Sequence, residues 1–156
     1  MIFSELFPES ARYCYVRTDP SYADLANFED LAAEEKSLVS QAVDVRKAEF
    51  GDARWCAHRA LQELGANPGT PILRGERGMP LWPEGFVGSM THTDGMRAAV
   101  VAPSNAMKSV GLDAEPAEPL PDHVLTMIAR AGEMPHLTRL REAGIKCPDR
   151  LLFCAK

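Results

Sequence analysis

The sequence contains no long apolar run, no block of basic residues and no pair of closely spaced cysteines. The longest aliphatic run, Ala98 to Ala102, is far shorter than the roughly 20 residues that cross a bilayer as a helix. The net charge of −5 argues against a general nucleic-acid-binding protein. Acidic Glu5 lies where a signal peptide would be positively charged, so we expect a cytoplasmic protein.

The cysteines do not form a recognisable metal or redox motif. They have no C-x-x-C spacing and no histidine at zinc-finger distance, which excludes the common small zinc sites. We therefore expect the thiols to act as small buried hydrophobic groups. A thiol-dependent enzyme is an alternative, although no neighbouring residue marks one thiol as a nucleophile. The four positions are Cys14, Cys56, Cys147 and Cys154.

The size and composition of the chain are those of one globular domain. It has 156 residues, of which 46% are hydrophobic and 25% charged. A chain of this length buries roughly two thirds of the surface that its unfolded form exposes. Composition therefore supports a folded domain and decides little about its activity.

The first half of the chain has the pattern of one long helix. The acidic stretch from Glu29 to Glu35 suits a helix N-terminus, because negative side chains interact favourably with the helix dipole. Apolar residues recur at roughly helical spacing up to Leu64, and Gly65 is a natural C-cap. Gly51 lies inside this segment and is expected to kink or divide the helix.

Strands are expected on both sides of the helix. Residues 12–17 are rich in aromatic and β-branched side chains, which favour strands. Residues 86–91 and 97–102 should pair as a hairpin around Asp94-Gly95, a favoured turn sequence. A further strand is expected at residues 108–115, after this hairpin. A helix followed by adjacent strands indicates an α+β fold in which a sheet packs on a helix.

The remaining segments are expected to be loop or helix. Residues 68–83 are rich in Gly and Pro and predict a loop, with a short extended piece at 71–74. Helical patterns cover residues 123–131 and 137–143. Asp149 is a plausible N-cap for a last helix.

Two carboxylates follow the apolar part of the segment Ser109-Val-Gly-Leu-Asp-Ala-Glu-Pro116. Side chains alternate along a strand, so Asp113 and Glu115 would point to the same side. A divalent cation relieves the repulsion between two such charges, and Mg²⁺ accepts one or two carboxylates together with water and phosphate oxygens. The alternative interpretation is a solvated strand end with two unrelated acids.

Three segments together resemble the 4′-phosphopantetheinyl transferases. They are Gly88-Ser-Met-Thr-His92, Val110-Gly-Leu-Asp-Ala-Glu115 and Phe153-Cys-Ala-Lys156. The corresponding family patterns are Gly-Ser-x-Thr-His, Val-Gly-(Ile/Leu)-Asp-x-Glu and Phe-(Ser/Cys)-Ala-Lys-Glu. The likeness runs from about Leu38 to the last residue, and it is strongest to the group that contains an enterobactin-synthase component and actinobacterial enzymes.

The resemblance implies a fold of two similar α+β halves with the active site between them. Residues 1–104 would form the N-terminal, coenzyme A-binding half, and residues 105–156 would begin the second half, with the metal site. The family has a glutamate after the lysine that corresponds to Lys156, where this sequence stops. We therefore expect a C-terminally truncated chain that is poorly stable or aggregation-prone when produced alone.

The resemblance also implies an activity. The enzyme would transfer the 4′-phosphopantetheine arm of coenzyme A to a serine of an apo acyl, peptidyl or aryl carrier protein, with Mg²⁺, and release 3′,5′-ADP. Asp113 and Glu115 would bind the metal, and Lys156 would act with them in catalysis. Such enzymes serve siderophore, polyketide and nonribosomal peptide biosynthesis, and the full-length protein would be a monomer.

Three arginines match basic positions of the family. Arg46 and Arg54 are eight residues apart, close to two helical turns, so they share a face. Arg74 follows in the expected loop. A planar guanidinium binds phosphate oxygens in pairs, which suits the phosphates of coenzyme A. Lys47 is the alternative to Arg46, and solvated surface arginines are the alternative interpretation of all three.

Ser89 and His92 are the remaining residues that the resemblance assigns to the coenzyme. Gly88 is expected to let the ligand approach the strand backbone closely. Trp82 either packs the loop under the nucleotide or belongs to the core. The other histidines show no pairing pattern and are interpreted as surface or structural residues: His58, His123 and His136.

Two functions outside this enzyme class stay open at the level of sequence. The first is a non-catalytic coenzyme A- or nucleotide-binding fragment that lacks the complete metal site. The second is a structural or interaction domain in which Asp113 and Glu115 are only a polar strand end.

Overall fold

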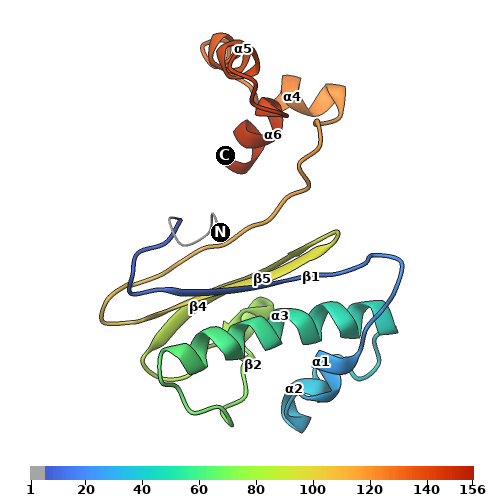
Figure 1. Ribbon diagram of the computed structural model, residues 1–156, viewed down its shortest axis with the longest axis vertical. Coiled ribbons are helices and arrows are strands. Elements are labelled where there is room, and N and C mark those ends of the chain that lie inside the picture. Colours follow the sequence, from blue (N-terminus) through green and yellow to red (C-terminus); the bar gives the residue numbers. More distant parts are fainter. Residues whose placement is uncertain (1–5) are drawn as a thin grey trace. The chain divides into compact units, whose positions relative to one another are not determined.

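The computed structural model describes residues 6–156, which divide into two compact units, residues 6–114 and 115–156. In the first unit, the long helix α3 (Asp44–Glu63) packs across one face of an antiparallel sheet (Figure 1). The second unit contains three short helices. The α+β class expected from the sequence is confirmed.

The sheet has the strand order β1-β5-β4 and is antiparallel throughout. Its strands are β1 (Arg12–Arg17), β4 (Phe86–Thr93) and β5 (Met96–Pro103). Asp94 and Gly95 make the turn between β4 and β5, and Gly95 has the positive φ of +73° that this turn needs. The strands expected at 12–17, 86–91 and 97–102 and the hairpin between the last two are therefore confirmed, with β4 and β5 slightly longer than expected.

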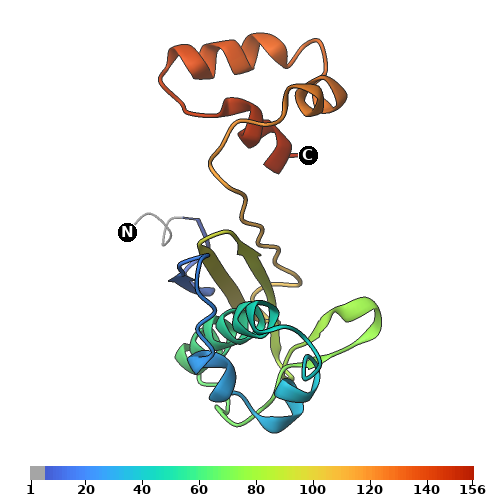
Figure 2. The same cartoon turned by 90° about the vertical axis from the view of Figure 1, so that its right-hand side faces the viewer.

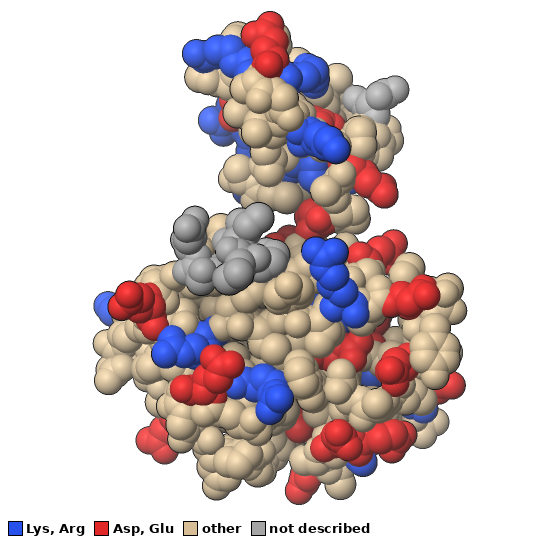
Figure 3. All heavy atoms as spheres, viewed as in Figure 1, with Lys and Arg blue, Asp and Glu red and all other residues tan. Residues whose placement is uncertain are grey.

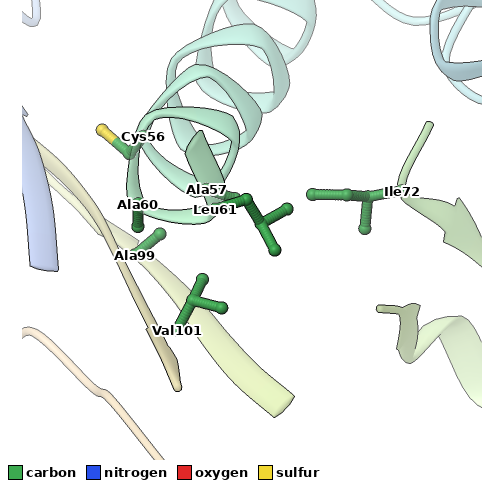
Figure 4. Close-up of a cluster of buried hydrophobic side chains, with 7 residues drawn as sticks. All are labelled: Cys56, Ala57, Ala60, Leu61, Ile72, Ala99 and Val101. Carbon is green, nitrogen blue, oxygen red and sulfur yellow. The ribbon is translucent and has the colours of Figure 1, made fainter. Parts of the chain in front are cut away.

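The main core lies between α3 and β5. Small side chains on α3 bring its axis close to the sheet, because alanine and cysteine leave little volume between the layers. Figure 4 shows these residues facing β5, with Leu61 directed toward the loop residue Ile72. The buried cluster consists of Cys56, Ala57, Ala60, Leu61, Ile72, Ala99 and Val101.

The single long helix expected from residue 29 onward is wrong. The structure has α1 (Ala26–Glu29), α2 (Ala33–Ser37) and then α3 as separate helices. The chain folds back after α2 because Phe28 and the nearby Leu31 and Val39 bury themselves against Phe50 of α3. The expected C-cap is correct: Gly65 has a φ of +81° directly after α3.

Gly51 does not kink or divide α3, which continues through it. A Cβ atom at this position would lie 2.5 Å from the backbone nitrogen of Phe28, so glycine allows α1 to approach α3 closely. We predict that Gly51→Ala lowers the free energy of unfolding by about 1–3 kcal/mol through overpacking. Urea unfolding tests this, since a glycine without a packing role would give the opposite sign and a gain of about 1 kcal/mol.

The segment between α3 and β4 is more ordered than the loop predicted from its Gly and Pro content. It contains β2 (Leu73–Arg74), the short 3₁₀ helix η2 (Glu76–Gly78) and β3 (Pro80–Leu81). β2 and β3 pair as a small hairpin that projects from the unit (Figure 2). Arg74 is therefore held on a strand beside the sheet.

Residues 108–115 do not form the strand expected after the hairpin, and the chain has no strand between Ser104 and Pro121. Instead, Val110 and Leu112 pack on the sheet face opposite α3, against Val100 and Ala102. Hydrogen bonds with side chains of β4 hold this segment, which has no backbone ladder to a neighbouring strand. The alternation argument for the direction of its two carboxylates therefore does not apply.

The second unit contains α4 (Asp122–Ile128), α5 (Met134–Glu142) and α6 (Pro148–Cys154). The expected helices are confirmed with shifted ends. Asp149 is not the N-cap of the last helix, because it lies inside α6 and Cys147 takes the N-cap position. Its Oδ2 accepts a 2.6 Å hydrogen bond from the Leu120 N–H and so ties the loop to α6. No helix among the described residues is long and apolar enough to span a membrane.

The burial expected of the cysteines is correct only in part. Cys56 is fully buried in the core, Cys14 and Cys147 are half-buried, and Cys154 is exposed. On the molecular face shown in Figure 3, basic and acidic side chains are interspersed and form no patch of one sign.

Candidate anion-binding pocket

A pocket of about 290 Å³ lies in the first unit, where α3, the β2–β3 hairpin and β4 meet. Its lining includes every side chain that the sequence assigned to coenzyme binding. The long helix supplies two of these residues, the hairpin one and β4 two. They are Arg46, Arg54, Arg74, Ser89 and His92.

Arg46 and His92 meet at the mouth of the pocket. The Arg46 side chain is 44% exposed, and its Nη1 lies 3.1 Å from the Glu49 carboxylate and 3.4 Å from His92 Nε2. Lys47, the alternative candidate, forms an ion pair of 3.8 Å with Asp44, and only Arg46 of the two is among the described lining residues. The structure thus places Arg46 at the pocket.

Arg54 forms the floor of the pocket and is 7% exposed. Its guanidinium stacks on the Phe50 ring at 3.7 Å and donates to the Ile72 carbonyl oxygen. Burial lowers the pKa of Arg54 to about 10, and the Glu35 carboxylate 3.3 Å from its Nε opposes this shift. Arg54 therefore stays charged at neutral pH and is held rigidly.

Glu35 is the most important residue that sequence reasoning missed. This carboxylate is 1% exposed and accepts hydrogen bonds from the Ile72 N–H at 3.1 Å and from His58 Nε2 at 3.0 Å, besides its ion pair with Arg54. His58 is thereby structural, as expected. The sequence gives no signal for Glu35, because an acid in an acidic helix usually faces solvent.

Arg74 is the most available cation of the pocket. Its side chain is exposed on β2, and no hydrogen bond or ion pair to another described residue engages it. Its charge contributes to the lowered pKa of Arg54, after burial and the opposing effect of Glu35. A phosphate in the pocket would compensate this excess of positive charge.

Gly88 is among the residues that line the pocket, and protein atoms fill the space that its side chain would occupy. A Cβ atom there would lie 2.6 Å from the Trp82 indole and 2.7 Å from the Val100 carbonyl oxygen, so Trp82 occupies the space. Trp82 packs on the main core as a partly buried side chain, and its contact with the nucleotide stays a prediction. Ser89 Oγ lies 3.4 Å from the Leu112 carbonyl oxygen and helps to hold the segment that leads to Asp113.

The two candidate metal ligands lie at the end of the first unit and the start of the second. Asp113 is exposed, and its Oδ1 accepts hydrogen bonds from Thr91 Oγ1 at 3.2 Å and from the Ala114 N–H at 3.0 Å. Glu115 Oε2 pairs with Arg150 at 3.1 Å. The described residues contain no cluster of three or more metal-ligating side chains. Two carboxylates nevertheless fit Mg²⁺, which completes its shell with water and phosphate oxygens.

Lys156, the third catalytic candidate, forms an ion pair within the second unit. Its Nζ lies 2.9 Å from Oε1 and 3.1 Å from Oε2 of Glu133. This ion pair gives the ammonium group a fixed local partner in the second unit.

A family model described as the 4′-phosphopantetheinyl transferase N-terminal domain matches residues 34–102, which include all five predicted pocket residues. The chain is 46% identical over 123 residues to the 4′-phosphopantetheinyl transferase PptT of Mycobacterium tuberculosis, covering 79% of this chain and 53% of that protein. The chain belongs to the 4′-phosphopantetheinyl transferase superfamily.

Two further transferases of the superfamily show the same degree of similarity. The 4′-phosphopantetheinyl transferase Npt of Nocardia iowensis is 46% identical over 130 residues, which cover 82% of this chain and 57% of Npt. Svp of Streptomyces mobaraensis is 48% identical over 128 residues, which cover 81% of this chain and 51% of Svp. The chain therefore spans about half the length of the curated relatives that it matches.

Proposed function

We propose that the protein transfers the 4′-phosphopantetheine arm of coenzyme A to a serine of an apo carrier protein. The observation that carries this proposal is the convergence of Arg46, Arg54, Arg74, Ser89 and His92 on one pocket. Three guanidinium groups and an imidazole are a donor set suited to phosphate. The names of the three relatives support the same activity.

The pocket suits the 3′-phosphate of coenzyme A better than its pyrophosphate. The pyrophosphate contains the bond that breaks and belongs beside the metal-binding carboxylates, so the arginines are left for the remaining phosphate. A terminal phosphate also carries about −1.5 to −2 charges at pH 7, which matches several cations. Arg54 and Arg74 would bind it, with Arg46 and His92 at the mouth.

Asp113 and Glu115 would hold Mg²⁺ through their carboxylate oxygens. Bound there, the ion would stabilise negative charge on the pyrophosphate and on the leaving group. Thr91 and the Ala114 N–H fix the Asp113 carboxylate by its Oδ1 and leave Oδ2 for a ligand. Arg150 fixes the Glu115 carboxylate through its Oε2 and leaves Oε1 for a ligand.

The proposed reaction is a single group transfer. The serine hydroxyl oxygen of the carrier attacks the β-phosphorus of coenzyme A, and the bond from this phosphorus to the bridging oxygen breaks. 3′,5′-ADP leaves with the electron pair, and the serine proton passes to a base. Lys156 would bind a phosphate oxygen or assist this deprotonation. Most of the rate gain in such transfers comes from positioning and charge stabilisation.

The partners follow from this chemistry. Acyl, peptidyl and aryl carrier proteins of polyketide, nonribosomal peptide or siderophore biosynthesis each present the acceptor serine. We place the enzyme in the cytoplasm and expect it to act as a monomer.

The intact mass of an apo carrier protein tests the proposed function. The carrier is incubated with coenzyme A, Mg²⁺ and the protein made from its full reading frame. The expected result is a mass gain of one phosphopantetheine. EDTA should abolish this gain, because it removes the Mg²⁺ that stabilises the charge on the pyrophosphate. No gain with several carriers would leave a non-catalytic coenzyme A-binding protein as the better account.

A further inference from the structure

Glu49 is a carboxylate on the wall of a pocket that is otherwise suited to anions. Its side chain is 22% exposed and lies between two arginines. Oε2 is 3.1 Å from Arg46 Nη1, and Oε1 is 3.6 Å from Arg97 Nη2. By its charge alone, Glu49 would weaken the binding of a phosphate, so its presence there needs another explanation.

The position of Glu49 is fixed from behind by β5. The Arg97 side chain is 9% exposed, and its Nη1 donates to Thr18 Oγ1, to the Thr93 carbonyl oxygen at 2.7 Å and to the Met96 carbonyl oxygen. Surface ion pairs between residues three apart on a helix contribute little, because both side chains move. Here the buried and hydrogen-bonded Arg97 holds the Glu49 carboxylate. The Arg46–Glu49 pair therefore differs from an ordinary surface ion pair.

The contacts continue from Glu49 into the pocket. Arg46, held on one side by Glu49, directs the same Nη1 toward His92 Nε2 at 3.4 Å. Arg97, Glu49, Arg46 and His92 thus form one connected row from the sheet to the mouth of the pocket. Without Glu49, the Arg46 side chain would have no ion pair among the described residues.

We propose that Glu49 is a positioning residue that holds Arg46 in the orientation needed to bind the phosphate of the coenzyme. This inference rests on the proposed function, since it assumes that the pocket takes a phosphate. The benefit is entropic: an arginine already fixed in place loses less side-chain freedom when the ligand binds. The gain from orientation exceeds the electrostatic penalty of the carboxylate.

The two effects of Glu49 predict opposite results for Glu49→Gln. If charge alone mattered, removing the carboxylate would strengthen the binding of adenosine 3′,5′-bisphosphate. Positioning predicts that the Kd of this probe, measured by calorimetric titration of the full-length protein, rises about tenfold, in the range of coupling between contacting residues. Glu49→Asp keeps the charge but withdraws it from Arg46, and is also expected to weaken binding.

A double-mutant cycle shows whether Glu49 acts through Arg46. In an Arg46→Gln background, Glu49→Gln should change the Kd by less than about twofold, because no guanidinium is left to orient. Glu63→Gln is the matched control on the same helix, where the carboxylate forms a surface ion pair of 3.7 Å with Arg12. The Kd of this control should equal that of the wild type.

Three results would overturn the inference. Binding by Glu49→Gln that equals or exceeds the wild type would show that orientation is unimportant. Equal weakening in the presence and absence of Arg46 would assign Glu49 a general structural role. A wild-type protein that does not bind the probe would overturn the proposed function as well, so the two failures are distinguishable.

Discussion

Asp113→Ala is expected to lower the rate of phosphopantetheine transfer by about a thousandfold in the full-length protein. Metal-assisted charge stabilisation contributes several kcal/mol to such a reaction, and each 1.36 kcal/mol is a factor of ten in rate. The substitution removes one of the two carboxylates assigned to Mg²⁺. Asp113 is exposed, so the fold should tolerate the change. The rate of mass gain of an apo carrier protein measures the effect.

The control for this substitution is Glu84→Ala, which removes an exposed acid from the loop before β4. Its transfer rate should equal that of the wild type. Both variants should melt within a few degrees of the wild type, which separates chemistry from folding. Transfer by Asp113→Ala at a near wild-type rate would remove this residue from the metal site.

Glu35→Ala is expected to destabilise the first unit by about 3–5 kcal/mol, the range measured when one partner of a buried ion pair is removed. The Glu35 carboxylate is 1% exposed and compensates the buried guanidinium of Arg54 at 3.3 Å. Its loss also leaves the Ile72 N–H without its acceptor. A natural domain has about 5–15 kcal/mol of stability in total, so most of the margin would be lost.

Urea unfolding followed by circular dichroism measures this loss of stability. Glu34→Ala is the matched control, because Glu34 is the adjacent acid on α2 and faces solvent. Its free energy of unfolding should differ from that of the wild type by less than about 0.5 kcal/mol. If the two variants were equally stable, the Glu35 network would not hold the pocket floor.

Local sequence signals predicted the parts of the structure that depend on local chemistry. The Asp94-Gly95 turn requires a positive φ, and Gly65 ends α3 with a positive φ as well. The position of each glycine therefore predicted the turn and the end of the helix. The eight-residue spacing of Arg46 and Arg54 placed both on one helix face, and both line the pocket. Periodicity carries this information because it depends only on helix geometry.

Tertiary packing decided what the sequence did not reveal. The break between α2 and α3 follows from the burial of Phe28 against Phe50, which no short window contains. The segment at 108–115 has the composition of a strand. Val110 and Leu112 nevertheless bury their side chains by packing on the sheet face, without strand pairing. Composition measures the preference for burial, and a ladder needs a partner strand as well.

The charged residues that organise the pocket were the hardest to find. Glu35 and Glu49 stand among other acids and bases in helical segments, where most such side chains are solvated. Only the fold brings Glu35 to Arg54, and Glu49 to Arg97 on another element. Residue type and spacing thus identified the groups that would touch the ligand, but not those that hold them in place.

Calorimetric titration of the full-length protein with coenzyme A and with 3′-dephospho-coenzyme A tests the central claim most directly. The pocket of three arginines is assigned to the 3′-phosphate. Coenzyme A should therefore bind at one site at least about tenfold more tightly, because each hydrogen bond to a charged group contributes about 1.5–3 kcal/mol. Equal affinity for the two ligands, or no binding of either, would contradict the assignment of this pocket to the coenzyme.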